Sequence, residues 1–200
     1  MSDVVTGDDG RGRCSWAVST ADYTAYHDDE WGRPVHGDPA LYERLTLEAF
    51  QSGLSWLTIL RKREGFRAAF AGFDPDAVAA FGPADVERLL LDASIVRNRA
   101  KVEAAVANAR AVVALRETQG EGALDALVWS HAPDPAARHQ PRTMADLPAT
   151  TPESTALARS LKRAGFRFVG PTTAYATMQA CGVVDDHLVG CWRRREAGSR

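Results

Sequence analysis

The sequence predicts an all-α protein, and three observations carry that prediction. Apolar residues recur at helical spacing in several segments, of which residues 98–118 form the longest. Many of these segments follow a helix-capping residue or begin with proline, which fits the first helical position. No segment shows convincing strand-like alternation, and neither repeats nor sustained heptads occur. We therefore expect packed helices with one long loop over residues 131–150, which contain four prolines.

The first helix that the sequence predicts begins at Asp38-Pro39. Leu41, Leu45 and Ala49 recur every four residues and therefore share one face. Gly53 is expected to follow the last helical turn, because glycine readily adopts the left-handed conformation found there. Further helices are predicted over residues 55–70, from Pro75, from Pro83, and over residues 98–118, 124–129, 152–164 and 171–181.

We predict no helix in two N-terminal segments. Residues 1–12 are polar and acidic and are expected to be disordered. Residues 21–38 are punctuated by Pro, Gly and Asp, with aromatic residues between them.

Composition sets limits on the function. A chain of 200 residues with 45% hydrophobic content can bury a full core, as one domain or two small ones. A net charge of −2 does not mark a nucleic-acid binder, so such a role would need local basic clusters. No apolar run approaches the ~18 residues of a membrane helix, and no signal peptide is evident. We therefore expect a cytoplasmic protein, in which three cysteines favour metal binding or burial over disulfides.

Glu48 lies on the edge of the apolar face of the helix from Asp38. The pattern alone favours a solvated acid. The helix break that follows, Gly53-Leu54-Ser55-Trp56, instead favours a pocket, because it places a flexible backbone, an apolar tip and a large aromatic ring beside the acid. Four large rings could form a box there for a flat, cationic ligand, through stacking and cation–π attraction: Trp16, Tyr26, Trp31 and Trp56. Each ring alone is also compatible with a place in the core.

Two further patterns could carry chemistry. His187 and Cys191 are four residues apart, which on a helical turn would suit two ligands of one tetrahedral zinc. Cys14 and His27 could supply the other two, closing the coordination shell of a structural metal; the alternative is buried cysteine and hydrogen-bonded histidine. Residues 152–181 form two helices around a glycine-bounded turn, with basic residues that could approach a phosphate or merely form a solvated face.

Six blocks of residues, in order, resemble bacterial 3-methyladenine DNA glycosylase I. They are Cys14-Ser15-Trp16, Tyr26-His27-Asp28-x-Glu30-Trp31-Gly32, Leu47-Glu48 through Trp56, Gly165 through Gly170, Met178 through Gly182, and Asp186-His187-x3-Cys191. The resemblance covers residues 13–192, which it identifies as a glycosylase domain, followed by a basic tail over residues 193–200. It implies a helix-hairpin-helix fold of two lobes with a DNA cleft between them.

The resemblance also implies roles for individual residues. A structural zinc would be bound by Cys14, His27, His187 and Cys191, tying both termini together. Glu48 would be the catalytic and base-recognising acid, with Tyr26, Trp56, Trp16 and Trp31 around the base. The tip Gly53-Leu54 would enter the duplex. From the glycine-bounded turn and its basic neighbours, rather than from the resemblance, we expect Arg163, Arg167 and Gly170 to meet phosphates.

The implied function is release of 3-methyladenine from alkylated double-stranded DNA by base flipping. We expect a monomeric, monofunctional enzyme that leaves an abasic site and needs no organic cofactor or membrane. The chain departs from related glycosylases in lacking a Leu-Pro-Gly-x-Gly hairpin and a catalytic Asp after it. Two alternatives are a zinc-stabilised helical DNA-binding module without catalysis and a zinc hydrolase with an open metal position.

Overall fold

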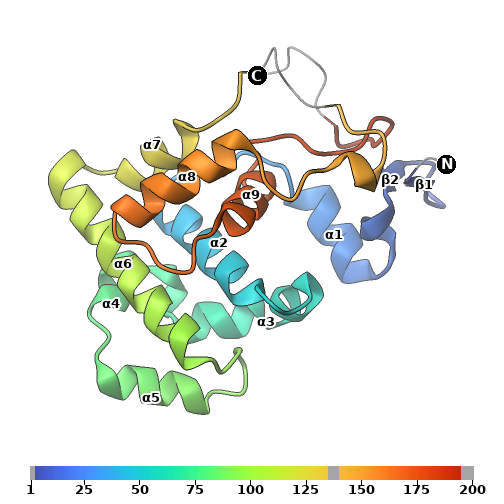
Figure 1. Cartoon of the computed structure of the whole chain (residues 1–200). Coiled ribbons are helices and arrows are strands. Elements are labelled where there is room, and N and C mark those ends of the chain that lie inside the picture. The colour runs from blue at the N-terminus through green and yellow to red at the C-terminus, as the bar shows by residue number, and fades with distance from the viewer. Residues whose placement is uncertain (1–2, 135–139, 195–200) are drawn as a thin grey trace.

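A computed structural model describes residues 3–134 and 140–194, and these form a mostly helical molecule (Figure 1). The predicted helices occur in the expected order along the chain, and one helix near the N-terminus, α1, was not predicted. Their bounds are α1 Ala21–Asp29, α2 Asp38–Gln51, α3 Trp56–Ala69, α4 Pro75–Ala79, α5 Pro83–Leu91, α6 Arg99–Gln119, α7 Ala123–Trp129, α8 Pro152–Arg163 and α9 Pro171–Ala180, with short 3-10 turns at Ser15–Val18, Ala71–Phe73 and Met144–Asp146. In the part of the chain described, no helix combines the length and apolar character needed to cross a membrane.

The N-terminal segment is a hairpin, where the sequence predicted disorder over residues 1–12. Strand β1 (Val4–Thr6) pairs antiparallel with β2 (Gly12–Cys14), with Val4 opposite Cys14. The hairpin is held from outside: the amide of Trp192 donates to the Gly12 carbonyl over 2.9 Å. The sequence missed it because each strand has only three residues, too few to show alternation, and the support from Trp192 comes from almost the other end of the chain. Residues 1 and 2 lie outside the described part, as do residues 195–200 of the predicted basic tail.

Helix α1 is the second feature that the sequence missed. The hydroxyl of Thr20 caps it by accepting from the amide of Tyr23. Tyr26 and His27 are buried on it side by side, so its polar and aromatic residues do not keep the apolar period that reveals other helices. Thr20 before the helix was the available signal.

Helix α2 occupies the centre of the fold, in contact with α3, α6, α7 and α9. Its buried Leu41, Leu45 and Phe50 join a core that extends into each of these neighbours. Gly53 has a φ of +81°, in agreement with its predicted place after the last turn, and Ser55 caps α3. This packing fixes the carboxyl end of α2 and the start of α3 relative to each other.

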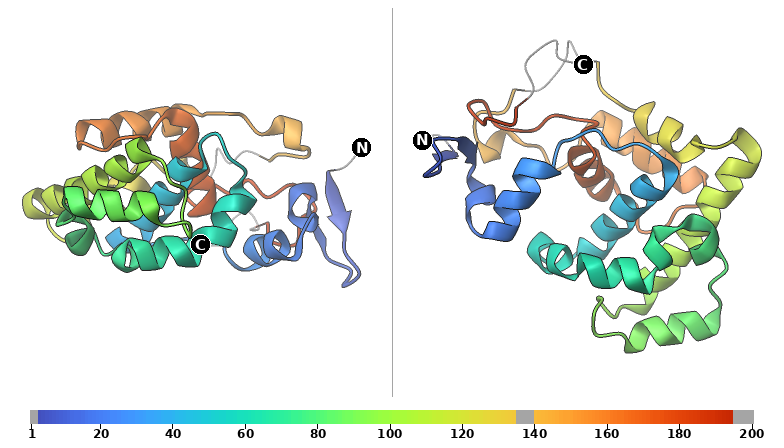
Figure 2. Two further views of the ribbon diagram at one scale, coloured as in Figure 1. Left: turned by 90° about the horizontal axis from the view of Figure 1, so that it is seen from below. Right: turned by 180° about the vertical axis from the view of Figure 1, so that it is seen from behind.

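Helices α8 and α9 pack against each other around the connection at residues 164–170. From α9 the chain runs back as irregular structure to β2, so the segment around Cys191 meets the N-terminal hairpin. Figure 2 shows that hairpin at one end of the molecule and α4, α5 and α6 at the other.

Candidate functional site

A cavity of about 410 Å³ opens beside the carboxyl-terminal half of α2. The acid and all four rings that the sequence grouped together line it, and Tyr23 joins them: Trp16, Tyr23, Tyr26, Trp31, Glu48 and Trp56. The rings brace one another, since Tyr26 and Trp56 have centroids 5.3 Å apart and Trp16 and Trp31 meet edge to face at 5.1 Å. Such a flat-walled space suits a planar ligand.

Glu48 is 6% exposed, so the solvated acid that the pattern alone favoured is absent. Burial raises the pKa of its carboxyl to about 8, and the nearby charge of Arg44 only partly offsets this. Burial therefore favours the neutral, protonated form of this carboxyl.

Among the described residues, the buried indole nitrogen of Trp56 lacks a hydrogen-bond partner. Beside it, burial is the main cause of the raised pKa values of the Glu48 carboxyl and the Tyr26 hydroxyl, to which no hydrogen bond contributes. Buried polar groups in folded proteins are nearly always paired, and unpaired ones gathered at one cavity indicate a ligand that completes them.

An ionic cluster supports the cavity from behind. Arg44 of α2 and Arg63 of α3 both donate to Glu30, with distances of 2.9 Å from Arg44 and of 2.6 and 2.8 Å from Arg63. Burial acts to raise the pKa of Glu30, but these hydrogen bonds hold it below its usual value. Arg44 stands one helical turn before Glu48, so the cluster fixes a positive charge near the acid.

Cys14, His27, His187 and Cys191 form a second site, next to the cavity. All four are buried, and their ligand atoms lie within 4.8 Å of one another, an arrangement that could hold a metal ion. The Cys191 sulfur lies 3.4 Å from His27 Nε2 and 3.5 Å from His187 Nδ1. Hydrogen bonding with Cys14 and then with the two imidazoles lowers the pKa of the Cys191 thiol.

The four residues meet for a different reason than the spacing suggested. His187 and Cys191 do not lie on a helical turn; the chain there is irregular and closes a turn from the amide of Cys191 to the carbonyl of Leu188, 2.9 Å away. Cys14 ends β2 and His27 lies in the last turn of α1. Both ends of the chain therefore converge here. Cys181, the third cysteine, is buried in the main core, away from the cluster.

Each histidine ring is held in place by a contact to the ring nitrogen that faces away from Cys191. Nδ1 of His27 lies 2.8 Å from Asp28, and Nε2 of His187 lies 3.2 Å from the carbonyl of Trp31. Metal-binding histidines are usually oriented in this way. Trp31 also packs edge to face against His187 at 4.7 Å, so the cluster and the cavity share a wall.

The tip between α2 and α3 projects into solvent at Leu54, which is 41% exposed. Lys101 at the start of α6 holds the tip in place, because its ammonium donates to the carbonyls of Phe50 at 2.9 Å and Ser52 at 2.5 Å. Single exposed apolar side chains are common on protein surfaces, so it is the position of Leu54 between two residues of the cavity lining, Gln51 and Trp56, that makes it a candidate contact.

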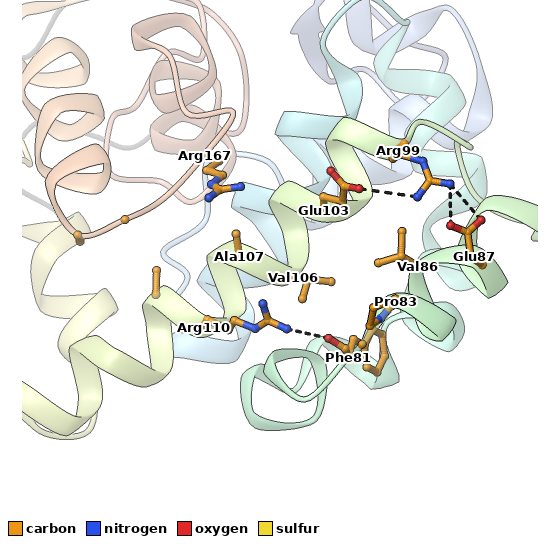
Figure 3. Close-up of a pocket in the computed structure, with 14 residues that line it drawn as sticks. Phe81, Pro83, Val86, Glu87, Arg99, Glu103, Val106, Ala107, Arg110 and Arg167 are labelled. Carbon is orange, nitrogen blue, oxygen red and sulfur yellow. Dashed lines mark hydrogen bonds and ion pairs between the residues drawn. The ribbon is translucent and has the colours of Figure 1, made fainter.

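The connection between α8 and α9 carries the predicted basic residues. The side chain of Asn108 anchors it by bonding both the amide and the carbonyl of Arg167, at 2.7 and 3.1 Å. The Arg167 guanidinium has no ion-pair partner within the described chain and faces a groove of about 620 Å³ between α5, α6 and this connection (Figure 3). Arg163 donates a hydrogen bond to the hydroxyl of Ser160, and Gly170 is the N-cap residue of α9.

Comparison with known proteins now decides the family. Residues 16–194 match the methyladenine glycosylase family. The chain belongs to that family. It is 48% identical over 184 residues to DNA-3-methyladenine glycosylase 1 of Escherichia coli K12, which covers 90% of this chain and 95% of that protein.

Solved structures of methyladenine glycosylases agree with this fold. A crystal structure of 3-methyladenine DNA glycosylase I aligns with a TM-score of 0.85 and 46% identity, covering 92% of this chain and 100% of the other. The glycosylase I of Staphylococcus aureus, studied for its recognition of 3-methyladenine, gives a TM-score of 0.85 at 34% identity, over 92% and 97% of the two chains. The predicted helical glycosylase fold is therefore confirmed, with a small two-stranded sheet added.

Within this methyladenine glycosylase, sequence reasoning missed several residues that line the cavity. The sequence indicated no role for Tyr23, which lines the cavity. Its hydroxyl accepts from the amide of Leu57 at 3.0 Å and so fixes the start of α3. Gln51 and Gln179 were not singled out. Gln179 stands in one of the six recognised blocks, which was the signal available.

Proposed function

We propose that the protein releases 3-methyladenine from alkylated double-stranded DNA by hydrolysing the N-glycosidic bond of a flipped nucleotide. The observation that carries the proposal is the buried, unpartnered Glu48 at an aromatic cavity. Relatives with 48% and 41% identity over 90% of this chain bear the name DNA-3-methyladenine glycosylase.

The chemistry of the base explains the cavity. Methylation at N3 makes adenine cationic, and its glycosidic bond is already weakened because the base departs neutral. The enzyme therefore needs to select and hold the base more than to force cleavage. The flipped base stacks on Trp56 and meets Glu48 and Tyr26 with its polar edge. A cationic base favours the ionised form of Glu48, and that negative charge also stabilises the developing positive charge on the sugar.

The enzyme is proposed to be monofunctional. Cleavage of the DNA strand by a glycosylase would use an amine as nucleophile, and no lysine is among the described residues that line the cavity. The product is then an abasic site. We also propose that the protein is a cytoplasmic monomer and that it needs no organic cofactor.

The metal in the Cys/His cluster is proposed to be zinc, in a structural role. Sulfur at ~2.3 Å and nitrogen at ~2.1 Å from one tetrahedral zinc would lie about 3.5 Å apart, and the Cys191 sulfur is 3.4 and 3.5 Å from the two imidazole nitrogens. Four protein ligands leave no open position for water, which argues against a zinc hydrolase. When bound, zinc would tie β2 and α1 to the C-terminal chain.

The DNA is proposed to approach across the α2–α3 tip and the α8–α9 connection, as a helix-hairpin-helix glycosylase of two lobes would bind it. Gly53 and Leu54 enter the duplex where the base leaves it. Arg163, Arg167 and the amides after Gly170 meet phosphates. The glycosylase domain comprises residues 13–192.

Measuring base release from alkylated duplex by the wild-type protein and by Glu48→Gln tests the function. Charge-assisted hydrogen bonds contribute about 1.5–3 kcal/mol, so Glu48→Gln is expected to release 3-methyladenine roughly ten- to a hundredfold more slowly, at ~1.4 kcal/mol per tenfold. Glu43→Gln is the matched control, since Glu43 lies on the same helix but pairs with Arg67. A wild-type protein that binds DNA but releases no base would instead be a zinc-stabilised DNA-binding module.

The comparison of Glu48→Gln with Glu48→Ala separates recognition from water activation. If Glu48 recognises the base, Glu48→Ala should release 3-methyladenine more slowly than Glu48→Gln, and both variants should bind the free base more weakly. A general base would leave both variants equally slow, with free-base binding little changed.

A further inference from the structure

Gln179 points from α9 into the same cavity as Glu48, and its amide is held in one orientation. It is half-buried and lines the cavity, while its Nε2 donates to Asp186 Oδ2 over 2.8 Å. Asp186 is 4% exposed. The contact between α2 and α9 places Gln179 and Glu48 on neighbouring helices around this space.

Asp186 decides which end of the amide faces the cavity. A carboxylate only accepts hydrogen bonds, so it selects the NH₂ end of Gln179. The hydroxyl of Tyr175 donates to the same oxygen, Oδ2, which leaves that oxygen with two donors. Without such a partner the two ends of a glutamine side chain are nearly interchangeable in shape.

The carbonyl end of Gln179 is therefore the end left for a ligand. No donor among the described residues meets its Oε1. The cavity then contains the neutral acceptor of Gln179 in addition to the acid of Glu48, and neither is used by the protein itself.

We propose that Gln179 is a specificity-determining residue whose Oε1 accepts a hydrogen bond from the exocyclic amino group of the flipped base. This inference rests on the proposed function. An amino group at the 6-position, as in adenine, satisfies the acceptor. An oxo group at that position, as in guanine, brings two acceptors together and leaves both unpaired, which a polar site strongly disfavours.

The first test replaces Gln179 with Met, which keeps the length of the side chain and removes the amide. Single-turnover release of 3-methyladenine and 3-methylguanine is measured from the same methylated duplex. We expect 3-methyladenine release to fall about three- to tenfold and the preference over 3-methylguanine to fall with it. An unchanged preference, or equal losses for both bases, would overturn the inference, because a merely structural role would affect both alike.

The second test removes the acceptor that selects the orientation of the amide. Asp186→Leu leaves the NH₂ end of Gln179 without its partner, so either end of the amide can turn toward the cavity. We expect the preference for 3-methyladenine over 3-methylguanine to fall, in a variant whose metal content is checked because His187 is adjacent. An unchanged preference in a correctly folded, metal-loaded variant contradicts the proposed orientation.

Gln119→Met is the control, because it makes the same exchange at the exposed carboxyl end of α6. Gln119 is not among the residues that line the cavity. Its preference between the two bases is expected to equal that of the wild-type protein. If the wild-type protein releases neither base, the proposed function fails; if it releases 3-methyladenine and Gln179→Met keeps the full preference, only this inference fails.

Discussion

The Cys/His cluster and the Glu48 cavity lie side by side but use polar groups in opposite ways. Consecutive residues of α1 serve them, His27 in the cluster and Tyr26 in the cavity. In the cluster, four ligand atoms converge on one point and the outer nitrogen of each histidine has a partner. In the cavity, Glu48 and the Trp56 indole nitrogen remain unpaired.

This difference distinguishes a site that stabilises the fold from a site whose polar groups are paired only when a ligand binds. Groups that satisfy one another, or a bound metal, contribute to folding. A buried acid without a partner lowers the stability of the empty protein and gains its partner only when a ligand arrives. Substitutions in the two sites should therefore change stability in opposite directions.

The largest effect is expected at the cluster. Cys191→Ala should reduce the free energy of unfolding on the order of 4 kcal/mol, which lowers the melting temperature roughly 8–16 °C. Metal analysis should show the wild-type protein with one zinc per chain and the variant with little. Any activity of the folded fraction should remain largely intact, because none of the four cluster residues lines the cavity.

Cys181→Ala is the control for loss of a buried thiol. Cys181 lies in the apolar core, so its replacement should reduce stability modestly and leave the zinc content unchanged. Wild-type protein without zinc, or an unchanged melt in Cys191→Ala, would refute the structural-metal assignment.

The same contrast explains what the sequence could predict. The helices of the core were found because their apolar period and their start signals are local, as with Pro39 in the first turn of α2 and the capping residue Ser55 before α3. Asp38 was the expected cap of α2, but Gly37 stands at that position, without a side-chain cap. The cluster residues were found from their chemistry and the family resemblance, although the helical turn assumed for His187 and Cys191 does not exist.

What the sequence could not predict depends on distant parts of the chain. The N-terminal hairpin is held by the segment around Trp192, and α1 mixes cavity and cluster residues, which hides its period. The burial of Glu48 arises from rings on η1 (Ser15–Val18), α1 and α3, which no pattern within α2 reveals. The amide orientation of Gln179 depends on Asp186, in irregular chain beyond α9.

At the cavity the expected change in the free energy of unfolding has the opposite sign, because a substitution of Glu48 should stabilise the protein. The pKa of Glu48 is raised from 4.5 to about 8, so below about pH 4.5 the folded and unfolded chains both hold the proton. As pH rises toward 8 the unfolded chain releases it first, and folding stability falls. Glu48→Gln removes this loss and should stabilise the metal-loaded protein by about 1–3 kcal/mol at pH 8.

Chemical denaturation of both proteins at pH 5 and pH 8 measures this effect. The advantage of Glu48→Gln should be small at pH 5 and grow with pH, while Glu43→Gln should show no such growth. A variant that is less stable than wild type at pH 8 would mean that Glu48 is paired in the free protein.

A smaller effect is expected at the tip of α2 and α3. Leu54→Ala should slow base release about tenfold, ~1.4 kcal/mol, because an apolar tip holds open the gap left by the flipped base. Binding to undamaged duplex should change little. Leu91→Ala, which removes a still more exposed leucine (82%) from α5, should leave release unchanged. Equal slowing in both variants would argue against insertion of the tip.

The smallest effect is expected from single arginines at the α8–α9 connection, and it should not depend on the lesion. Arg167 faces the groove without an ion-pair partner in the described chain, whereas Arg110 across the groove is committed to the carbonyls of Ala79 and Phe81 (Figure 3). A free guanidinium on a phosphate adds affinity without reading bases. Arg167→Ala should therefore weaken binding to damaged and undamaged duplex alike and reduce the slope of log K against log salt by about 1.

Binding titrations at several salt concentrations measure that slope. Arg163→Ala should behave similarly, since the Arg163 guanidinium bonds a serine and no acid among the described residues. Arg116→Ala should have no effect, because Arg116, in the last turn of α6, pairs with Asp76 of α4. A change in lesion preference in Arg167→Ala would mean that this arginine acts on the flipped base rather than on the phosphate backbone. The DNA would then lie closer to the cavity than the approach proposed here, and the cavity alone would not account for selectivity.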